Sequence, residues 1–287
     1  MHYELLTARY GSGEARAIYE LVMWRRFGLS RTDILLGKDT NLSADDKAEL
    51  QIIIHRIAKG EPVQYVLGCE EFCGHTFLVG PGVLIPRPET QQLVQLVQSH
   101  VAPGSKVLDV GTGSGCIAIT LALAGYRLTA LDVSEEALDY ARRNAGRLGA
   151  EVEFVKGNIQ TLSNSPSKGK TKEGLALEGE VWRGSAIVSN PPYVCEKEAA
   201  EMDENVLMHE PHLALFVPDD APLLFYRAIA DYGLQHLEAE GWLFFEANRA
   251  YAAQVGELLV QKGYTNVKTI KDEYDNDRFV CARRKAL

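Results

Sequence analysis

The sequence predicts an α/β fold, namely a mostly parallel seven-stranded sheet with an antiparallel edge hairpin, preceded by a small all-helical domain and a linking β-hairpin. Three observations lead to this prediction. Apolar residues recur at helical spacing in the first part of the chain, short extended pieces broken by glycine follow, and strand-like and helical segments then alternate. We expect a helical N-terminal domain over residues 1–71, a hairpin within 72–85 and the main domain over 86–287.

Length and composition agree with this division. The chain has 287 residues, close to two domains at roughly 150 residues each. It is 46% hydrophobic and carries 30 basic against 39 acidic residues, so its net charge is −9. Such a balance is typical of a soluble globular protein and disfavours binding nucleic acid by charge alone.

Targeting and redox signals are weak. No apolar run approaches the roughly 18 residues of a membrane span, and the N-terminus lacks the order of a signal peptide. The five cysteines are odd in number and scattered, which is typical of free thiols in a reducing compartment. We therefore expect a cytoplasmic protein with no membrane contact, and nothing in the sequence demands more than a monomer.

Two amphipathic helices are predicted near the N-terminus, over Glu14–Phe27 and Ser43–Lys59. Ser43 is expected to cap the second helix, which Gly60 ends and Pro62 cannot continue. These helices are expected to form a packed bundle, or to help dock a protein substrate. The linking hairpin is expected within Phe72–Leu84, where glycine and proline break the chain.

The main domain is predicted from alternating elements. Helices are expected over Ser134–Leu148 and Ala221–Glu238, and Thr161–Gly174 has the polar composition of a loop insertion. The last two expected strands are separated only by a turn-rich stretch and should pair antiparallel at one edge. The predicted strands are Lys106–Val110, Arg127–Asp132, Glu151–Val155, Ser185–Ser189, Trp242–Glu246, Val267–Lys271 and Arg278–Arg283.

A glycine-rich turn joins the first of these strands to an apolar helix. Glycines let the backbone approach a ligand closely, and the helix start adds free N–H groups. Asp132 ends the next strand, where a carboxylate can accept both hydroxyls of a ribose. Together these features predict a site for an adenosine-type cofactor, with NAD and S-adenosylmethionine both possible at this point. The turn comprises Asp109, Val110, Gly111, Thr112, Gly113, Ser114 and Gly115.

Asn190-Pro191-Pro192-Tyr193 follows the fourth strand of the main domain. The side-chain carbonyl of Asn190 and the backbone carbonyl of Pro191 offer two acceptors, which can take both hydrogens of a planar NH2 group. Such a nitrogen is a poor nucleophile, and accepting both hydrogens should draw electron density onto it. Tyr193 can stack on a flat substrate. The tetrapeptide favours methyl transfer to nitrogen over NAD chemistry.

At this point the chain resembles the release-factor N5-glutamine methyltransferases, which are Rossmann-like class I enzymes that use S-adenosyl-L-methionine. The resemblance covers nearly the whole chain, and the pairing of an Ile-Pro-Arg-Pro-Glu-Thr stretch with Asn-Pro-Pro-Tyr is specific. The stretches that carry it are Glu61–Gly68 with Glu71-Phe72, Val83–Thr90, Asp109–Gly115, Ser189–Tyr193, Glu210-Pro211, and Lys271-Asp272 followed by Arg278.

The resemblance implies methylation of the side-chain amide of the glutamine in the Gly-Gly-Gln loop of peptide chain release factors, with S-adenosyl-L-homocysteine as the second product. Asn190, Pro191, Pro192 and Tyr193 would bind the substrate glutamine. Residues implied to contact the cofactor are Asp109, Gly111, Thr112, Gly113, Ser114, Gly115, Asp132, Asn158, Ile159 and Asn190.

Two positions depart from the family pattern. Asn158 occupies a position near adenine that is usually acidic, and Phe216–Asp220 replaces a glycine-rich stretch. Two other hypotheses remain from the residues themselves. An adenine-N6 methyltransferase of DNA or RNA would use the same tetrapeptide but should carry a basic channel, and an idle scaffold should have a damaged site.

Metal chemistry is not expected. Cys69 and Cys73 lack a second ligand pair nearby, and Pro211 breaks the helix that His209 and His212 would need to bind a metal together. The segment around Glu210 is expected instead to shape the substrate mouth.

Overall fold

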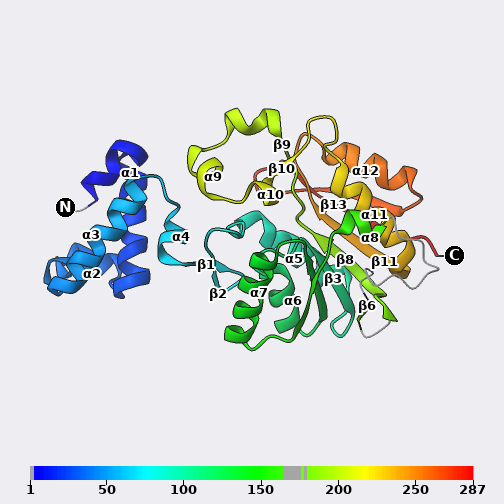
Figure 1. Cartoon of the computed structure of the whole chain (residues 1–287), viewed down its shortest axis with the longest axis horizontal. Coiled ribbons are helices and arrows are strands. Elements are labelled where there is room, and N and C mark those ends of the chain that lie inside the picture. The colour runs from blue at the N-terminus through cyan, green and yellow to red at the C-terminus, as the bar shows by residue number, and fades with distance from the viewer. Residues whose placement is uncertain (1–2, 164–175, 178–179, 287) are drawn as a thin grey trace.

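The computed structural model describes residues 3–163, 176–177 and 180–286. A helical N-terminal domain lies beside a larger α/β domain, and a thin connection through α4 and the first hairpin joins the two (Figure 1). The predicted fold class is confirmed, including the mostly parallel seven-stranded sheet.

The N-terminal domain has its own apolar core, in which Leu6, Val22 and Met23 of the first helix meet Ile54 and Ile57 of the third. Ser43 caps α3 as predicted, because its hydroxyl oxygen accepts a hydrogen bond from the Asp46 N–H. The first helix begins well before the expected Glu14 and bends at Gly11, where φ is 69°. The elements are α1 (Glu4–Phe27), α2 (Arg31–Leu35), η1 (Lys38–Asn41), α3 (Ala44–Ala58) and α4 (Val63–Leu67).

The linking hairpin consists of β1 (Cys69–Phe72) and β2 (His75–Leu78), so it lies earlier than the expected Phe72–Leu84. Its turn is Cys73-Gly74, and both residues have positive φ, 49° and 77°. Such a two-residue turn follows the right-handed twist of the strands. The glycines and proline after Leu78 form a separate connection. Because the prediction took them as part of the hairpin, it placed the hairpin too late in the chain.

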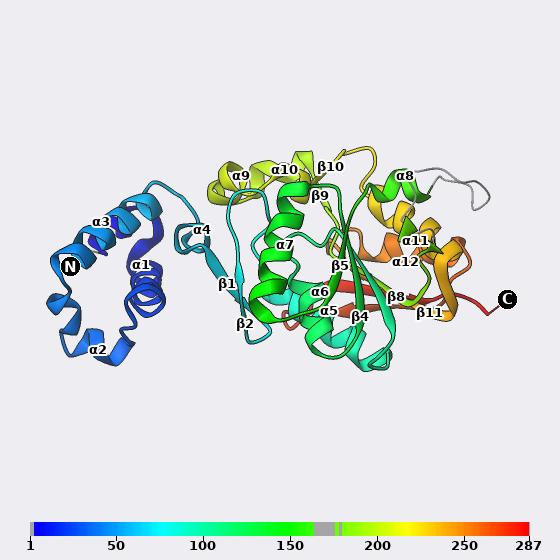
Figure 2. The same cartoon turned by 60° about the horizontal axis from the view of Figure 1, so that its bottom comes forward.

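The main sheet has the strand order β12-β13-β11-β8-β3-β4-β5. β13 pairs antiparallel with β11 and β12, whereas the pairs from β11 through β8, β3 and β4 to β5 are parallel. The sheet is seen nearly edge-on in Figure 2. Its strands are β3 (Lys106–Val110), β4 (Arg127–Asp132), β5 (Val152–Lys156), β8 (Gly184–Ser189), β11 (Leu237–Glu246), β12 (Thr265–Lys271) and β13 (Asp277–Arg283).

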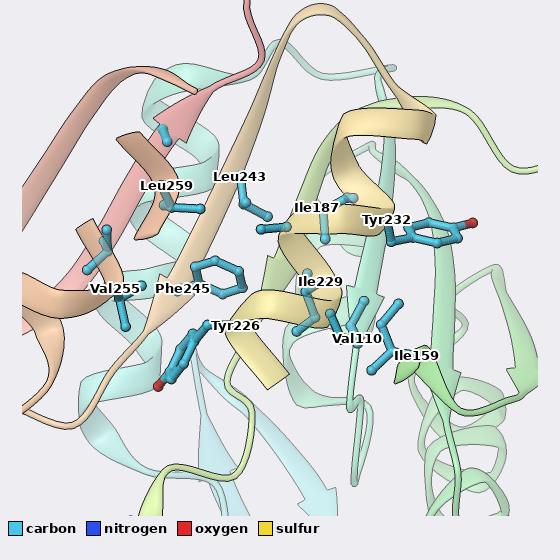
Figure 3. Packing of buried hydrophobic residues seen from close by; sticks show 14 of the residues in the cluster. Val110, Ile159, Ile187, Tyr226, Ile229, Tyr232, Leu243, Phe245, Val255 and Leu259 are labelled. Carbon is cyan, nitrogen blue, oxygen red and sulfur yellow. The ribbon is translucent and has the colours of Figure 1, made fainter. Parts of the chain in front are cut away.

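Helices cover both faces of this sheet. One face packs on α5 (Pro88–His100), α6 (Cys116–Leu123) and α7 (Glu135–Leu148). The other packs on α8 (Ile159–Ser163), α11 (Leu224–His236) and α12 (Ala252–Gln261), whose side chains interdigitate with strand residues such as Ile187 and Phe245 (Figure 3). Burying both faces fixes the sheet as a rigid base for its carboxyl edge.

The expected loop insertion Thr161–Gly174 is only partly described. Thr161, Leu162 and Ser163 form the end of helix α8 rather than a loop, and residues 164–174 lie outside the described residues. Beyond them, β6 (Ala176–Leu177) and β7 (Glu180–Val181) form a small antiparallel pair.

Residues 196–215, the helical lobe, extend from the carboxyl edge of the sheet between two short strands. β9 (Val194–Cys195) and β10 (Phe216–Val217) pair in parallel and close the lobe at its base. Phe216–Asp220, which departs from the family's glycine-rich pattern, thus begins with a strand. The lobe contains η2 (Glu196–Glu201), α9 (Glu204–His209) and α10 (His212–Leu215).

The helical lobe also touches the N-terminal domain. Arg9 of α1 donates to the carboxylate of Glu204 at 2.8 Å and to the side-chain oxygen of Asn205 at 3.2 Å. Within the described part of the chain, none of the helices combines the length and the apolar character that a membrane span requires.

Candidate active site

The predicted site residues gather where β3 and β8 end side by side. β4, the next strand in the chain, lies on one side of β3, and β8 lies on the other, so the order in which strands are added to the sheet reverses here. Ligands of open α/β sheets bind at such a point. The Ser189 hydroxyl donates to the Val110 carbonyl oxygen at 2.7 Å and ties the two strand ends together. The glycine turn after β3 and the tetrapeptide after β8 therefore face one another.

The glycine turn borders a cavity of about 390 Å³, the glycine-turn cavity. Gly111 and Gly113 line it with φ of 75° and 55°, and a Cβ on either would meet no protein atom within 4 Å. Gly115 has a different role. A Cβ there would lie 2.8 Å from Ile119 Cδ1 and 3.0 Å from Ala141 Cβ, so this glycine permits close packing beneath the turn.

Asp132 lines the same cavity at the end of β4. Its two carboxylate oxygens accept backbone N–H groups, Oδ2 from Gly113 and Oδ1 from Ser134, both at 2.9 Å. Burial raises the pKa of this carboxyl above its ordinary value, while these backbone donors act in the opposite direction. Each oxygen retains a lone pair for a hydroxyl group, so the geometry suits a ribose.

Three other predicted cofactor residues lie behind the cavity wall. Asp109 is fully buried, and one of its carboxylate oxygens accepts the Thr112 hydroxyl at 2.7 Å. Burial raises the pKa of Asp109 to about 7. The backbone carbonyl of Ser114 accepts the side-chain amide of Asn144 at 2.9 Å. These groups shape the turn, and direct contact between them and a cofactor stays a prediction.

Asn158 and Ile159 also line the glycine-turn cavity. The Asn158 side-chain oxygen accepts the Gln160 N–H at 2.9 Å, which turns the chain into α8. The cavity volume falls within the roughly 300–1,000 Å³ of small-molecule sites. Two open glycines, a half-buried carboxylate and a side-chain amide fit a nucleoside bearing a charged tail.

Asn190 and Pro191 line a second cavity as well, the lobe cavity, of about 350 Å³. The lobe cavity extends from these two residues to Tyr193 and Arg87 and is walled by the helical lobe, while Pro192 faces only the glycine-turn cavity. The two cavities therefore border one another, and Leu84, Asn190, Pro191 and Ala214 line both. A ligand in either cavity would lie against Asn190 and Pro191.

A family model described as a PrmC N-terminal domain matches residues 3–68, and one described as a methyltransferase domain matches residues 107–170. The chain is 43% identical over 277 residues to a release factor glutamine methyltransferase of Bacteroides thetaiotaomicron. The aligned region covers 96% of this chain and 95% of that relative. A relative of the same description from Bacillus subtilis is 34% identical over 281 residues, covering 94% and 92%.

The chain belongs to the release factor glutamine methyltransferases. The resemblance read from its motifs is thereby confirmed. A methyltransferase of Pyrococcus furiosus shares the fold, with a TM-score of 0.51 at 18% identity over 85% of this chain and all of that one.

Three residues of this methyltransferase that complete the site were not assigned a role from the sequence. Glu210, whose side chain is buried, accepts Arg87 Nη2 at 2.6 Å and the Ile85 N–H at 3.1 Å, which joins the lobe to the Ile-Pro-Arg-Pro-Glu-Thr stretch. Thr90 and Glu246 are buried beside Asn190. The repeated proline in the stretch was a signal for a fixed backbone, but only the fold brings these partners together.

No cluster of His, Cys, Asp or Glu within the described part of the chain could hold a metal ion. His209 and His212 flank Pro211, whose φ of −67° and ψ of 123° are extended, between the short helices α9 and α10. Pro211 lines the glycine-turn cavity.

Proposed function

We propose that this methyltransferase transfers a methyl group from S-adenosyl-L-methionine to the side-chain amide nitrogen of the glutamine in the Gly-Gly-Gln motif of peptide chain release factors. The observation that carries the proposal is the meeting of the two cavities at Asn190 and Pro191. The names of its relatives supply the release factor and the glutamine.

The glycine-turn cavity would hold the cofactor. Gly111 and Gly113 leave room beside the turn for its methionine part. Asp132 would accept its ribose hydroxyls, and Asn158, which lines the same cavity, would contact adenine. S-Adenosyl-L-methionine, when bound, supplies a methyl group on a positively charged sulfur. The lobe cavity would take the glutamine side chain with its flanking glycines.

Asn190 Oδ1 and the Pro191 carbonyl oxygen would accept the two hydrogens of the glutamine amide. Delocalisation into the carbonyl makes this nitrogen a weak nucleophile, and the two acceptors return electron density to it. The bound cofactor would supply the methyl carbon, and its sulfur would keep the electron pair of the S–C bond as the leaving group. The nitrogen then loses one proton to a carbonyl oxygen or water, so alignment matters more than a strong base.

The proposed partner is a release factor alone, bound by a monomer in the cytoplasm. All five cysteines are free thiols, which suits that compartment. The net charge of −9 argues against nucleic acid as the substrate.

The test is methyl transfer from labelled S-adenosyl-L-methionine to a purified release factor. A factor with its Gly-Gly-Gln glutamine changed, and unmethylated DNA and RNA, serve as comparison substrates. We expect label on the intact factor alone, and Asn190→Ala should lower the rate by about 100-fold to 1,000-fold, as when one positioned polar group of an active site is removed. Label on nucleic acid alone would instead favour the adenine-N6 reaction.

A further inference from the structure

Glu246 is a buried carboxyl that the proposed reaction does not use. It ends β11 at the carboxyl edge of the sheet, and only 1% of its surface is exposed. Hydroxyl groups bond both of its oxygens. Thr90 donates to Oε2 at 2.7 Å and Tyr193 donates to Oε1 at 3.3 Å. An ionisable group this deeply buried is costly and therefore calls for an explanation.

The bond from Thr90 has a direction that matters for Asn190. A threonine hydroxyl has a single hydrogen, so once Thr90 donates to a carboxylate its oxygen can only accept. Asn190 Nδ2 donates to that oxygen at 3.2 Å. If the Asn190 amide were turned over, its oxygen would face the Thr90 oxygen with no hydrogen between them.

The carboxylate thereby selects which end of the Asn190 amide faces the ligands. With Nδ2 held by Thr90, Oδ1 is the end left for the cavities, and it accepts no hydrogen bond within the part of the chain that the structure describes. A turned amide would present two hydrogens to the substrate NH2 group, which would place donors against donors.

We propose that Thr90 and Glu246 are positioning residues, which hold Asn190 with its carbonyl oxygen toward the substrate amide. The inference rests on the proposed function. It explains why the two motifs occur together. Thr90, the last residue of the Ile-Pro-Arg-Pro-Glu-Thr stretch, lies in the first turn of α5 and contacts Asn190, the first residue of Asn-Pro-Pro-Tyr.

Protonation of Glu246 would weaken this selection. A protonated carboxyl can donate to Thr90, whose own hydrogen is then free to bond Asn190 Oδ1 and stabilise the turned amide. Burial raises the pKa of Glu246 to about 7. The proposed orientation is therefore best maintained above that pH.

Besides Thr90, four groups lie next to Glu246, three near its carboxyl and one at its backbone carbonyl. Arg278 favours its charged form and Glu89 opposes it. The hydroxyl of Tyr193 bonds its side chain, and that of Tyr226 donates to the Glu246 backbone carbonyl oxygen at 3.1 Å.

The test compares Thr90→Val with Thr120→Val in single-turnover methyl transfer at saturating cofactor. Thr120 is a matched control, since it is buried in α6 and its hydroxyl has no hydrogen-bond partner among the residues that the structure describes. We expect Thr90→Val to slow transfer by about 10-fold to 100-fold, a size typical of groups that orient a reacting ligand, with cofactor affinity unchanged. Thr90→Ser should restore most of the rate.

The pH profile supplies a second readout. The wild-type rate should rise as Glu246 ionises, and Glu246→Gln should be slow and lose that rise. Because the pKa of Asp109 is also raised to about 7, a rise that persists in Glu246→Gln would assign the profile to another group and overturn the role of Glu246. Equal rates for Thr90→Val and Thr120→Val would overturn the role of Thr90.

A third readout does not depend on the substrate. The side-chain NH2 signals of Asn190, assigned in nitrogen-15-labelled enzyme with Asn190→Asp, should shift and exchange faster with water in Thr90→Val. If the wild type fails to methylate the release factor while these signals respond, the proposed function fails and the hydrogen-bond chain stands. Signals that do not change would overturn the inference.

Discussion

The glycine-turn cavity and the lobe cavity share Asn190 and Pro191, yet they are built in different ways. The first is formed mainly by residues that follow parallel strands, where each turn is specified by a few neighbouring residues. The second depends on the helical lobe, on Arg87 and on contacts between residues far apart in the chain. The comparison indicates that the glycine-turn cavity depends more on local turns, and the lobe cavity more on tertiary contacts, although Pro211, Leu213 and Ala214 of the lobe also line the first.

Of the changes that compare the two cavities, the largest effect is expected where a side chain would enter the glycine-turn cavity. Gly113→Ala should weaken S-adenosyl-L-methionine binding by about 10-fold to 100-fold, because a methyl group would project where the ligand is expected. Titration calorimetry measures this. Gly104→Ala is the matched control, since Gly104 also has positive φ and open space around it but does not line the cavity. Equal affinities for the two variants would contradict the cofactor assignment.

An intermediate effect should separate the two cavities. Arg87→Met removes the ion-pair partner of the buried Glu210, so the lobe wall loses its anchor. We expect KM for the release factor to rise about tenfold, with unchanged cofactor affinity and partial recovery in Arg87→Lys. Arg142→Met, which breaks an exposed ion pair on α7, should change neither value. If Arg87→Met weakened cofactor binding equally, the cavities would not be independent.

The smallest effect concerns Asn158. Its side-chain oxygen is already used by the Gln160 N–H, so the amide nitrogen is the end that remains for adenine. An aspartate has an acceptor at both ends and suits the adenine amino group. Asn158→Asp should therefore strengthen cofactor binding by about fivefold, close to one hydrogen bond. Unchanged or weaker binding would show that residue 158 does not face the adenine amino group.

The same contrast explains how far the sequence could be interpreted. The strands Lys106–Val110 and Arg127–Asp132 were predicted to the residue, because each is an apolar run that ends at a chemical signal. The hairpin was predicted too late in the chain. Its turn contains Cys73 in a left-handed conformation, and cysteine is not a residue type that indicates a turn. Helix α1 begins at Glu4 and continues through the bend at Gly11, so it starts earlier than the expected Glu14.

In the site, the sequence identified residues that line the two cavities but not the residues that support them. Asn190 and Asp132 follow strands and carry a recognisable chemistry, so position and residue type were enough. Thr90, Glu210 and Glu246 each act through a partner more than 100 residues away, Glu210 with Arg87 and Thr90 with Glu246. No local pattern specifies such a partner.

The hydrogen bond from the Ser189 hydroxyl to the Val110 carbonyl oxygen would help to fix the distance between the two bound ligands. It locks together two neighbouring strands whose spacing in any sheet is about 4.8 Å. Donor and acceptor ligands would rest on the ends of these strands, so the gap between them is measured out by the backbone ladder. Loop motions elsewhere can admit or release ligands while the separation between these two strand ends stays the same.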